Sequence, residues 1–272
     1  MCRIFQGLGE GIWQLITSVK NPKIKEVRAL QSRTKTRREA GVFVVEGVRL
    51  AEEAVAAGWH TQLCLYTSEL SPRGLDLVRS LSDSKAPVEL VAEHVMKSVS
   101  DTQSPQGILL VMEQQVLPLP EHPELLLVLD RMQDPGNAGT LIRSAAAAGF
   151  DAVFLTEGSV DGFSPKVLRA GMGAHFRMPV LTAPTIEIVE LCQLHGLLLW
   201  SASVDAGQIY TDANLRAPLA IVIGGEAHGV GEPLHDSSNL VHIPMPGGGE
   251  SLNAAAAGAV LIFEVVRQRS QK

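Results

Sequence analysis

Short apolar runs and amphipathic segments alternate along the chain from residue 22 onward. Between residues 22 and 31, Ile24, Val27 and Leu30 recur at helical spacing with Lys and Arg on the opposite side, which predicts a helix. The same reading predicts strands at 42–46, 61–66, 88–91 and 107–112, and helices at 48–57, 74–81 and 93–99. We expect the basic run 33–38 to be an exposed connection. This alternation predicts an α/β domain.

A second series of elements follows a segment with three prolines. Residues 125–129 are apolar throughout, as in a strand buried on both faces of a parallel sheet. Further strands are expected at 152–155, 197–201 and 219–223 and at a short run ending at Ile243, with helices at 139–148, 185–195 and 252–269. The prolines predict a stiff linker at 114–124. We therefore expect one domain at 16–113 and a second at 125–272.

Composition indicates a soluble globular protein. The chain has 272 residues, 46% of them hydrophobic and 19% charged, which is enough for two cores. No apolar run reaches the length of a membrane span. Residues 1–15 lack the apolar region of a secretory signal, so we expect either a disordered tail or the product of an early start codon.

The cysteine and histidine pattern favours a reducing cytoplasm and no metal. Cys2, Cys64 and Cys192 are widely separated, which supports neither a disulfide framework nor a zinc site. We predict cytoplasmic localisation.

Charge is distributed unevenly along the chain. The net charge is −6, yet residues 17–50 contain nine basic and three acidic side chains. Such a stretch predicts a surface that faces a polyanion, although a solvated helix face is an equally good interpretation of composition alone. The candidate RNA-binding residues are Lys20, Lys25, Arg33, Lys35, Arg37 and Arg38.

Glycine-rich and polar segments follow three of the apolar strands. They are Gln133 to Arg143, Gly224 to Gly229, and Pro244 to Asn253, the last containing three consecutive glycines. Each alone is more simply a turn that leads into a capped helix. Because ligands of open α/β sheets lie at the carboxyl ends of the strands, the three together predict one shared binding site.

These segments resemble the three motifs of the SpoU (TrmH) family of RNA ribose 2′-O-methyltransferases. The matching residues are Asn137-x-Gly139-x-x-x-Arg143, Gly224-Gly225-Glu226-x-x-Gly229, and Ile243-Pro244-Met245-x-Gly247 with Ser251-Leu252-Asn253. The resemblance covers about 125–268, with a looser one to the family's N-terminal RNA-binding domain over about 16–112. Gly171 departs from the Ser of many relatives, and Ala254 and Ala255 from their Val and Ser.

The resemblance implies a fold, a reaction and a set of site residues. It implies a parallel-sheet SPOUT domain with a deep trefoil knot, a smaller L30e-like α/β N-terminal domain, and a homodimer formed through the C-terminal domain. The implied reaction uses S-adenosylmethionine and RNA; the resemblance favours ribosomal RNA, with a transfer RNA 2′-O-methyltransferase as the alternative. The implied catalytic residues are Arg143, Asn137, Glu226, Ser251 and Asn253, and the cofactor-binding residues are Gly224, Gly225, Ile243, Met245, Leu252 and Thr156.

Arg143 is the residue that we expect to matter most for the chemistry. A guanidinium suits phosphate recognition and stabilisation of charge that develops on the attacking oxygen. The family's alternative role for it is a general base, which we disfavour because a guanidinium hardly loses its proton in a protein.

Two other interpretations remain open. One is a catalytically silent RNA-binding or ribosome-assembly protein of the same fold, which the retention of all five catalytic candidates disfavours. The other is a Rossmann-type oxidoreductase, which is disfavoured because no Gly-x-Gly-x-x-Gly opens a helix after the first strand of the second domain.

Overall fold

The computed structural model describes residues 15–204, 208–226, 228–248 and 251–271. The chain divides into two compact units, Met1–Gln115 and Val116–Lys272, which are described separately below. The tail expected at residues 1–15 lies outside the described residues except for Leu15. Among the described residues, no helix has both the length and the apolar character needed to cross a membrane.

The N-terminal unit is built on a four-stranded sheet with the order β1-β4-β2-β3. β4 runs antiparallel to β1 and to β2, while β3 is parallel to β2. The strands are β1 (Val42–Glu46), β2 (Thr61–Tyr66), β3 (Val88–Leu90) and β4 (Ile108–Glu113). The described helices are α1 (Pro22–Ser32), α2 (Thr34–Ala40), α3 (Val48–Ala56), α4 (Pro72–Asp83) and α5 (Glu93–Val99).

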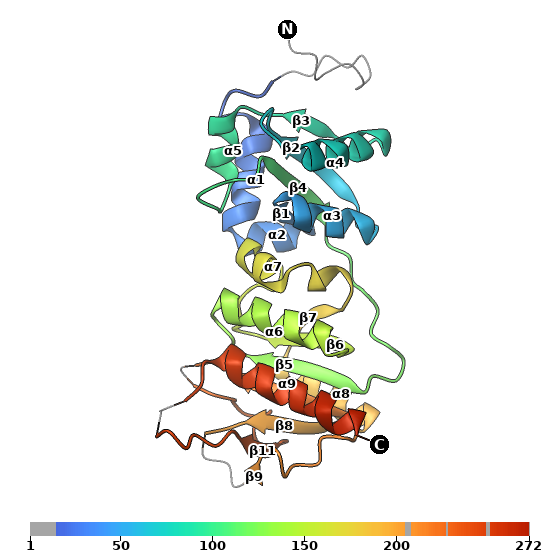
Figure 1. The fold of residues 1–272 in the computed structure, drawn as a ribbon, viewed down its shortest axis with the longest axis vertical. Helices are drawn as coiled ribbons and strands as arrows, with labels where there is room; N and C mark the ends of the chain where they lie inside the picture. The colour runs from blue at the N-terminus through green and yellow to red at the C-terminus, as the bar shows by residue number, and fades with distance from the viewer. Residues whose placement is uncertain (1–14, 205–207, 227, 249–250, 272) are drawn as a thin grey trace. The chain divides into compact units, whose positions relative to one another are not determined.

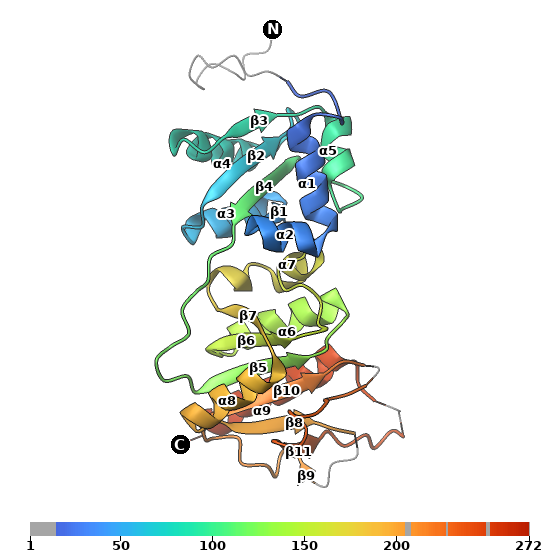
Figure 2. The same cartoon turned by 180° about the vertical axis from the view of Figure 1, so that it is seen from behind.

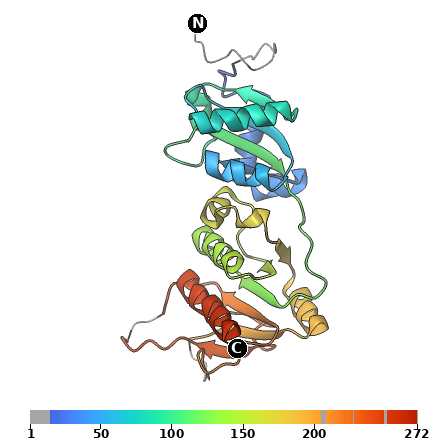
Figure 3. The ribbon, with the colours of Figure 1, turned by 45° about the vertical axis from the view of Figure 1, so that its right-hand side comes forward.

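Helices cover both faces of this sheet. Ile24, Val27 and Leu30 of α1 are buried in one cluster with residues of α5 and the sheet, so the expected apolar face of α1 is confirmed. Figure 3 shows α3 and α4 next to each other on the other face. There the rings of Phe43 and Trp59 meet edge to face, with their centroids 5.5 Å apart. Both faces of the small sheet are therefore buried.

The basic run that we expected to be an exposed connection is helical. α2 covers Thr34–Ala40 and ends at Gly41, whose φ of 63° lies in the left-handed region that favours glycine. Arg37 holds the junction between α1 and α2. Its guanidinium donates to the carbonyl of Leu30 at 2.6 Å and to the hydroxyl of Thr34 at 3.0 Å. Satisfying these groups allows one helix to follow the other directly.

The C-terminal unit is a seven-stranded parallel sheet with the order β7-β6-β5-β10-β8-β11-β9, which confirms the predicted α/β class. The strands are β5 (Leu125–Asp130), β6 (Ala152–Thr156), β7 (Val180–Ala183), β8 (Leu198–Ala202), β9 (Gln208–Ile209), β10 (Leu219–Gly224) and β11 (Asn239–His242). The described helices are α6 (Pro135–Ala147), α7 (Pro165–Gly171), α8 (Thr185–His195) and α9 (Ala254–Ser270), with a 3-10 turn at Ala174–Phe176.

The central strands β5, β6 and β10 are buried on both faces, as the apolar runs predicted. Leu127 and Leu129 of β5 belong to the core that includes residues of α6 and α9, whereas Leu126 and Val128 belong to the core that includes residues of α8. Figure 1 accordingly shows α6 and α9 in front of this sheet, and Figure 2 shows α8 on the reverse side. Each fully buried Leu or Val contributes roughly 1.5–3 kcal/mol relative to an exposed one.

Helix α6 begins earlier than expected. We predicted its start at Gly139, but it starts at Pro135, because Asp134 caps it by accepting from the backbone N–H of Asn137 at 2.7 Å. Gly139 lies inside the helix, where a Cβ would come within 2.5 Å of Ala170 Cβ. α6 and α7 therefore pack closely because position 139 has no side chain.

A buried histidine lies beside α7. His175 is 1% exposed, and its Nε2 lies 2.9 Å from the carbonyl oxygen of Gly162. Burial lowers the pKa of His175 to about 4, against weaker opposing effects of the Gly162 hydrogen bond and the charge of Asp161. The imidazole is thus neutral in the folded protein at neutral pH.

Acid should destabilise the protein through His175. The pKa of His175 in the folded protein is below the ordinary value of 6.5, so the neutral imidazole stabilises the folded state fully above pH 6.5. This stabilisation is lost as the pH falls toward 4. Between pH 7 and pH 5, the free energy of unfolding of His175→Gln should fall by about 2 kcal/mol less than that of wild type. Urea denaturation at both pH values measures this difference. The exposed His122→Gln is the control. An unchanged pH dependence in His175→Gln would contradict this account.

Candidate functional site

Three loops at the carboxyl ends of parallel strands meet through one set of hydrogen bonds. Asn137 lies on α6 after β5, Glu226 follows β10, and Asn253 precedes α9 after β11. The Asn137 amide donates to Glu226 Oε1 at 2.6 Å, and the Asn253 amide donates to Asn137 Oδ1 at 3.0 Å and to Glu226 Oε1 at 3.2 Å. The structure thus brings together three of the five catalytic candidates, which we call the polar cluster.

Both asparagines of the polar cluster belong to helix starts. Asn253 caps α9, since its Oδ1 accepts from the backbone N–H groups of Ala255 and Ala256 at 3.0 and 3.2 Å. Asn137 lies in the first turn of α6 and is 9% exposed. Two helix N-termini, each with partial positive charge, therefore lie beside the Glu226 carboxylate.

The loop that carries Glu226 is held in place by the buried carboxylate of Asp130. Asp130, at the end of β5, is 2% exposed. It accepts from the Thr156 hydroxyl at 2.8 Å and from the backbone N–H of Gly231 at 2.8 Å. Gly224 and Gly225 precede Glu226, and a Cβ on either would come within 2.6 Å of backbone atoms. These positions require glycine because the chain segments approach so closely.

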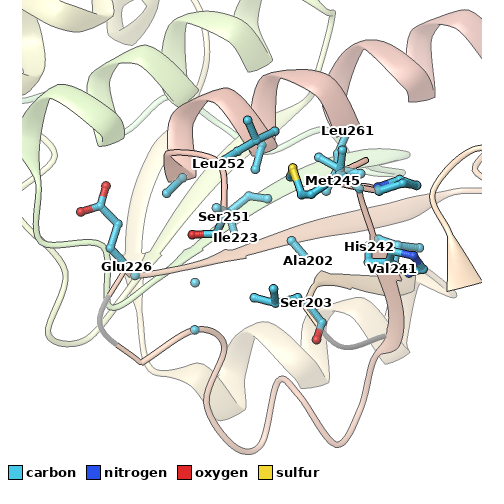
Figure 4. A pocket seen from close by; sticks show the side chains of 18 residues that line it. Ala202, Ser203, Ile223, Glu226, Val241, His242, Met245, Ser251, Leu252 and Leu261 are labelled. Carbon is cyan, nitrogen blue, oxygen red and sulfur yellow. The ribbon is translucent and has the colours of Figure 1, made fainter. Parts of the chain in front are cut away.

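A cavity of about 460 Å³ opens beside the polar cluster. Figure 4 shows Glu226 and Ser251 toward one end, His242 toward the other, and Leu252 and Met245 on the wall between them. The remaining lining comes mainly from the ends of β8, β10 and β11 and from α9. This volume and mixed lining are typical of a small-molecule site.

Most of the cofactor-binding candidates line this cavity, as do two of the catalytic ones. The lining residues among them are Gly224, Gly225, Glu226, Ile243, Met245, Ser251 and Leu252. Thr156 is an exception and corrects our expectation. It is fully buried, is not part of the lining, and its hydroxyl bridges Asp130 to the backbone N–H of Arg131 at 2.9 Å. Its position at a strand end suggested ligand contact, but it serves the loop anchor instead.

One wall of the cavity, formed at the end of β8, was not predicted from the sequence. Ala202 ends β8 and Ser203 and Val204 follow it; all three line the cavity, yet none belongs to a motif. The order of strands shows why they are there, since β8 lies between β10 and β11. Only the sheet order brings this segment beside the two motif loops.

Arg143 makes no recorded hydrogen bond or ion pair to the polar cluster among the described residues. It is exposed on α6, two turns after Asn137, and the structure records no hydrogen bond or ion pair between it and another described residue.

The basic candidates of the N-terminal unit divide into two groups. Lys20, Lys25, Arg33, Lys35 and Arg38 are exposed. Arg37 does not fit the predicted RNA contact, because it is 4% exposed and its guanidinium is bonded to the end of α1. Separately, no group of three or more His, Cys, Asp or Glu side chains could hold a metal ion within the described parts of the chain.

Both units match known protein families. Residues 124–263 match the SpoU rRNA Methylase family, and residues 21–110 match the MRM3-like substrate binding domain.

Individual relatives match over most of the chain. The chain is 32% identical over 253 residues to the 23S rRNA guanosine 2′-O-methyltransferase RlmP of Bacillus subtilis, covering 92% of this chain and 98% of that protein. It is 32% identical to the human mitochondrial rRNA methyltransferase 3, covering 85% of this chain and 69% of that protein. The crystal structure of an AdoMet-bound rRNA methyltransferase from Sinorhizobium meliloti matches with a TM-score of 0.84 and 30% identity, covering 93% and 97% of the two chains.

Replacing Asn253 tests its role as the cap of α9. Asn253→Ala should lower the free energy of unfolding by about 1 kcal/mol, because two N–H groups of α9 lose their acceptor. Asn253→Ser should lose less, since serine also caps helices. Urea denaturation followed by circular dichroism measures both. Equal stability of wild type and Asn253→Ala would show that the cap contributes nothing.

Proposed function

Because the chain belongs to the SpoU rRNA methylase family, we propose that it transfers a methyl group from S-adenosylmethionine to a ribose 2′-OH of ribosomal RNA. The observation that carries the proposal is the polar cluster beside the cavity, at the carboxyl ends of parallel strands. The names of the relatives favour ribosomal over transfer RNA. The reaction takes place in the cytoplasm.

The cavity fits S-adenosylmethionine in size and chemistry. Its volume of about 460 Å³ suits a ligand with both an adenine ring and an amino-acid portion. Apolar side chains of Ile243, Met245 and Leu252 line it, as do Gly224 and Gly225, where no side chain blocks the backbone. We assign these residues to cofactor binding. When bound, S-adenosylmethionine supplies a methyl group carried on a positively charged sulfur.

The polar cluster orients the groups that act on the acceptor hydroxyl. The two amide donors, Asn137 and Asn253, fix the direction of the Glu226 carboxylate before RNA arrives. We assign Ser251 to contact with the acceptor ribose, because it lines the cavity at the same end as Glu226 (Figure 4). Holding the hydroxyl in line with the methyl group lowers the barrier by positioning.

Arg143 provides positive charge for the reacting RNA. As an exposed guanidinium without a partner among the described residues, it can pair with an RNA phosphate or stabilise the developing alkoxide. In this proposal it does not act as a base, since a guanidinium keeps its proton.

The N-terminal unit holds the RNA. Its match to the MRM3-like substrate binding domain and the exposed Lys20, Lys25, Arg33, Lys35 and Arg38 support this role. We further propose that this unit is L30e-like, and that the C-terminal unit contains the deep trefoil knot that the family resemblance implies.

The C-terminal unit forms a homodimer in this proposal. An apolar stripe remains exposed along α9, where Ala256, Val260 and Phe263 recur at helical spacing. Val260 is 36% and Phe263 49% exposed. A second copy of the chain would bury this stripe, and a closed two-fold contact would use the same surface on both partners.

Methyl transfer to RNA that lacks its own modification tests the activity. Label from S-adenosylmethionine should appear in alkali-resistant dinucleotides, because a methylated 2′-OH blocks cleavage at its own linkage. Arg143→Ala should lower the rate by about 100-fold or more, as does loss of one transition-state donor. The exposed Arg216→Ala is the matched control. Label in mononucleotides would indicate base methylation, and cofactor binding without transfer to any cellular RNA would favour a silent RNA-binding protein.

Sedimentation analysis tests the dimer. Wild type should sediment as a dimer, and Phe263→Lys should shift the protein toward the monomer, because a charge would be buried in the contact. Leu194→Lys on α8, which also replaces an exposed apolar residue, should leave the dimer unchanged. A monomeric wild type, or a dimeric Phe263→Lys, would contradict the proposed contact.

A further inference from the structure

A second, smaller hollow adjoins the cavity. It has a volume of about 210 Å³ and is lined in part by Arg131, Gln133, Asp134, Gly158 and His228. We call it the outer hollow. Gly225, Glu226 and Gly229 line both spaces, so they share one wall.

Glu226 provides the one side chain of that shared wall among the described residues, since the other shared positions are glycines. The shared wall therefore includes the Glu226 carboxylate of the polar cluster. Methyl transfer requires the acceptor oxygen and the methyl carbon to meet, so the acceptor must approach a boundary that the cofactor also reaches. The outer hollow adjoins the cavity at such a boundary.

Arg131 is held in place at the edge of the outer hollow. Its φ of 48° is left-handed, and its backbone N–H donates to the Thr156 hydroxyl at 2.9 Å. Its Nε lies 3.4 Å from Asp130 Oδ2, and a Cβ on Gly231 would lie 2.4 Å from its Nη2. The guanidinium is therefore positioned against the backbone of Gly231 before a ligand binds, which reduces the entropy lost on binding.

Gln133 adds an amide to the same hollow. Its side chain is exposed, and no hydrogen bond from it is recorded to any residue that the structure describes. An amide offers donors and an acceptor together, and a guanidinium offers paired donors. These are the groups that proteins use to read the edges of nucleobases.

We propose that the outer hollow binds the base of the acceptor nucleotide and that Arg131 and Gln133 read the edge of that base. The inference rests on the proposed methyl transfer, because the position of the hollow matters only if an acceptor must meet the cofactor at Glu226. Sequence-selective RNA recognition commonly uses unstacked bases bound in such pockets. In this view the two residues determine which nucleotide is methylated.

Replacing the base of the acceptor tests the inference. The nucleotide that wild type methylates in a ribosomal RNA transcript is first mapped by alkaline hydrolysis, and transcripts with each other base at that position are then compared. Wild type should prefer its own base by about fivefold or more, the discrimination expected of one good base contact. Gln133→Ala and Arg131→Ala should each reduce this preference, with unchanged affinity for S-adenosylmethionine as the test of folding. Gln193→Ala and Arg216→Ala, at exposed positions away from the hollow, should retain the full preference.

The outcomes separate this inference from the proposed function. If wild type methylates all four bases equally, or if both variants keep the wild-type preference, the outer hollow does not read the base. If Gln133→Ala and Arg131→Ala lose affinity for S-adenosylmethionine to the same extent as they lose preference, the two residues support the loop and do not read the base. If wild type methylates no RNA, the proposed function itself fails and the inference fails with it.

Discussion

The hydrogen bonds among Asn137, Glu226 and Asn253 are the interaction on which the site depends. The three residues come from three segments far apart in the sequence, and they meet only because β5, β10 and β11 end at the same edge of one parallel sheet. Asn253 also caps α9, and the backbone of Asn137 is bound by the cap of α6. Helix starts and site geometry are therefore coupled, so a change at the cluster affects both.

The loop that carries Glu226 depends on two glycines that have no side chain. The chain passes so close to itself at Gly224 and Gly225 that a Cβ at either position would overlap backbone atoms. The buried Asp130 carboxylate holds this loop in place, because it accepts hydrogen bonds from the Thr156 hydroxyl and from the backbone N–H of Gly231. The result is a closely packed loop beside a cavity with a mixed polar and apolar lining. Groups that are positioned before a ligand binds lose little entropy on binding.

The sequence predicted the elements whose pattern is local and missed those decided by tertiary contact. The strands 42–46 and 61–66 were predicted with their observed bounds; the first is buried throughout, which leaves few polar positions. The start of α6 was placed too late, although Asp134 and Pro135 are a cap and a first-turn residue by local rules. Thr156 was assigned to the cofactor from its position at a strand end, and Arg37 to RNA from its place in a basic stretch. Both instead satisfy backbone groups that only the folded chain brings to them. The β8 wall depends on strand order, which periodicity does not reveal.

A crystal structure of the protein with S-adenosylhomocysteine tests the central claim most directly. The claim is that the cavity beside the polar cluster holds the cofactor with its reacting end toward Glu226 and Ser251. We predict density for the ligand within this cavity, its sulfur at the Glu226 end, and the hydrogen bonds of the polar cluster retained. A ligand bound elsewhere on the chain, or one whose sulfur lies at the His242 end, would contradict the account.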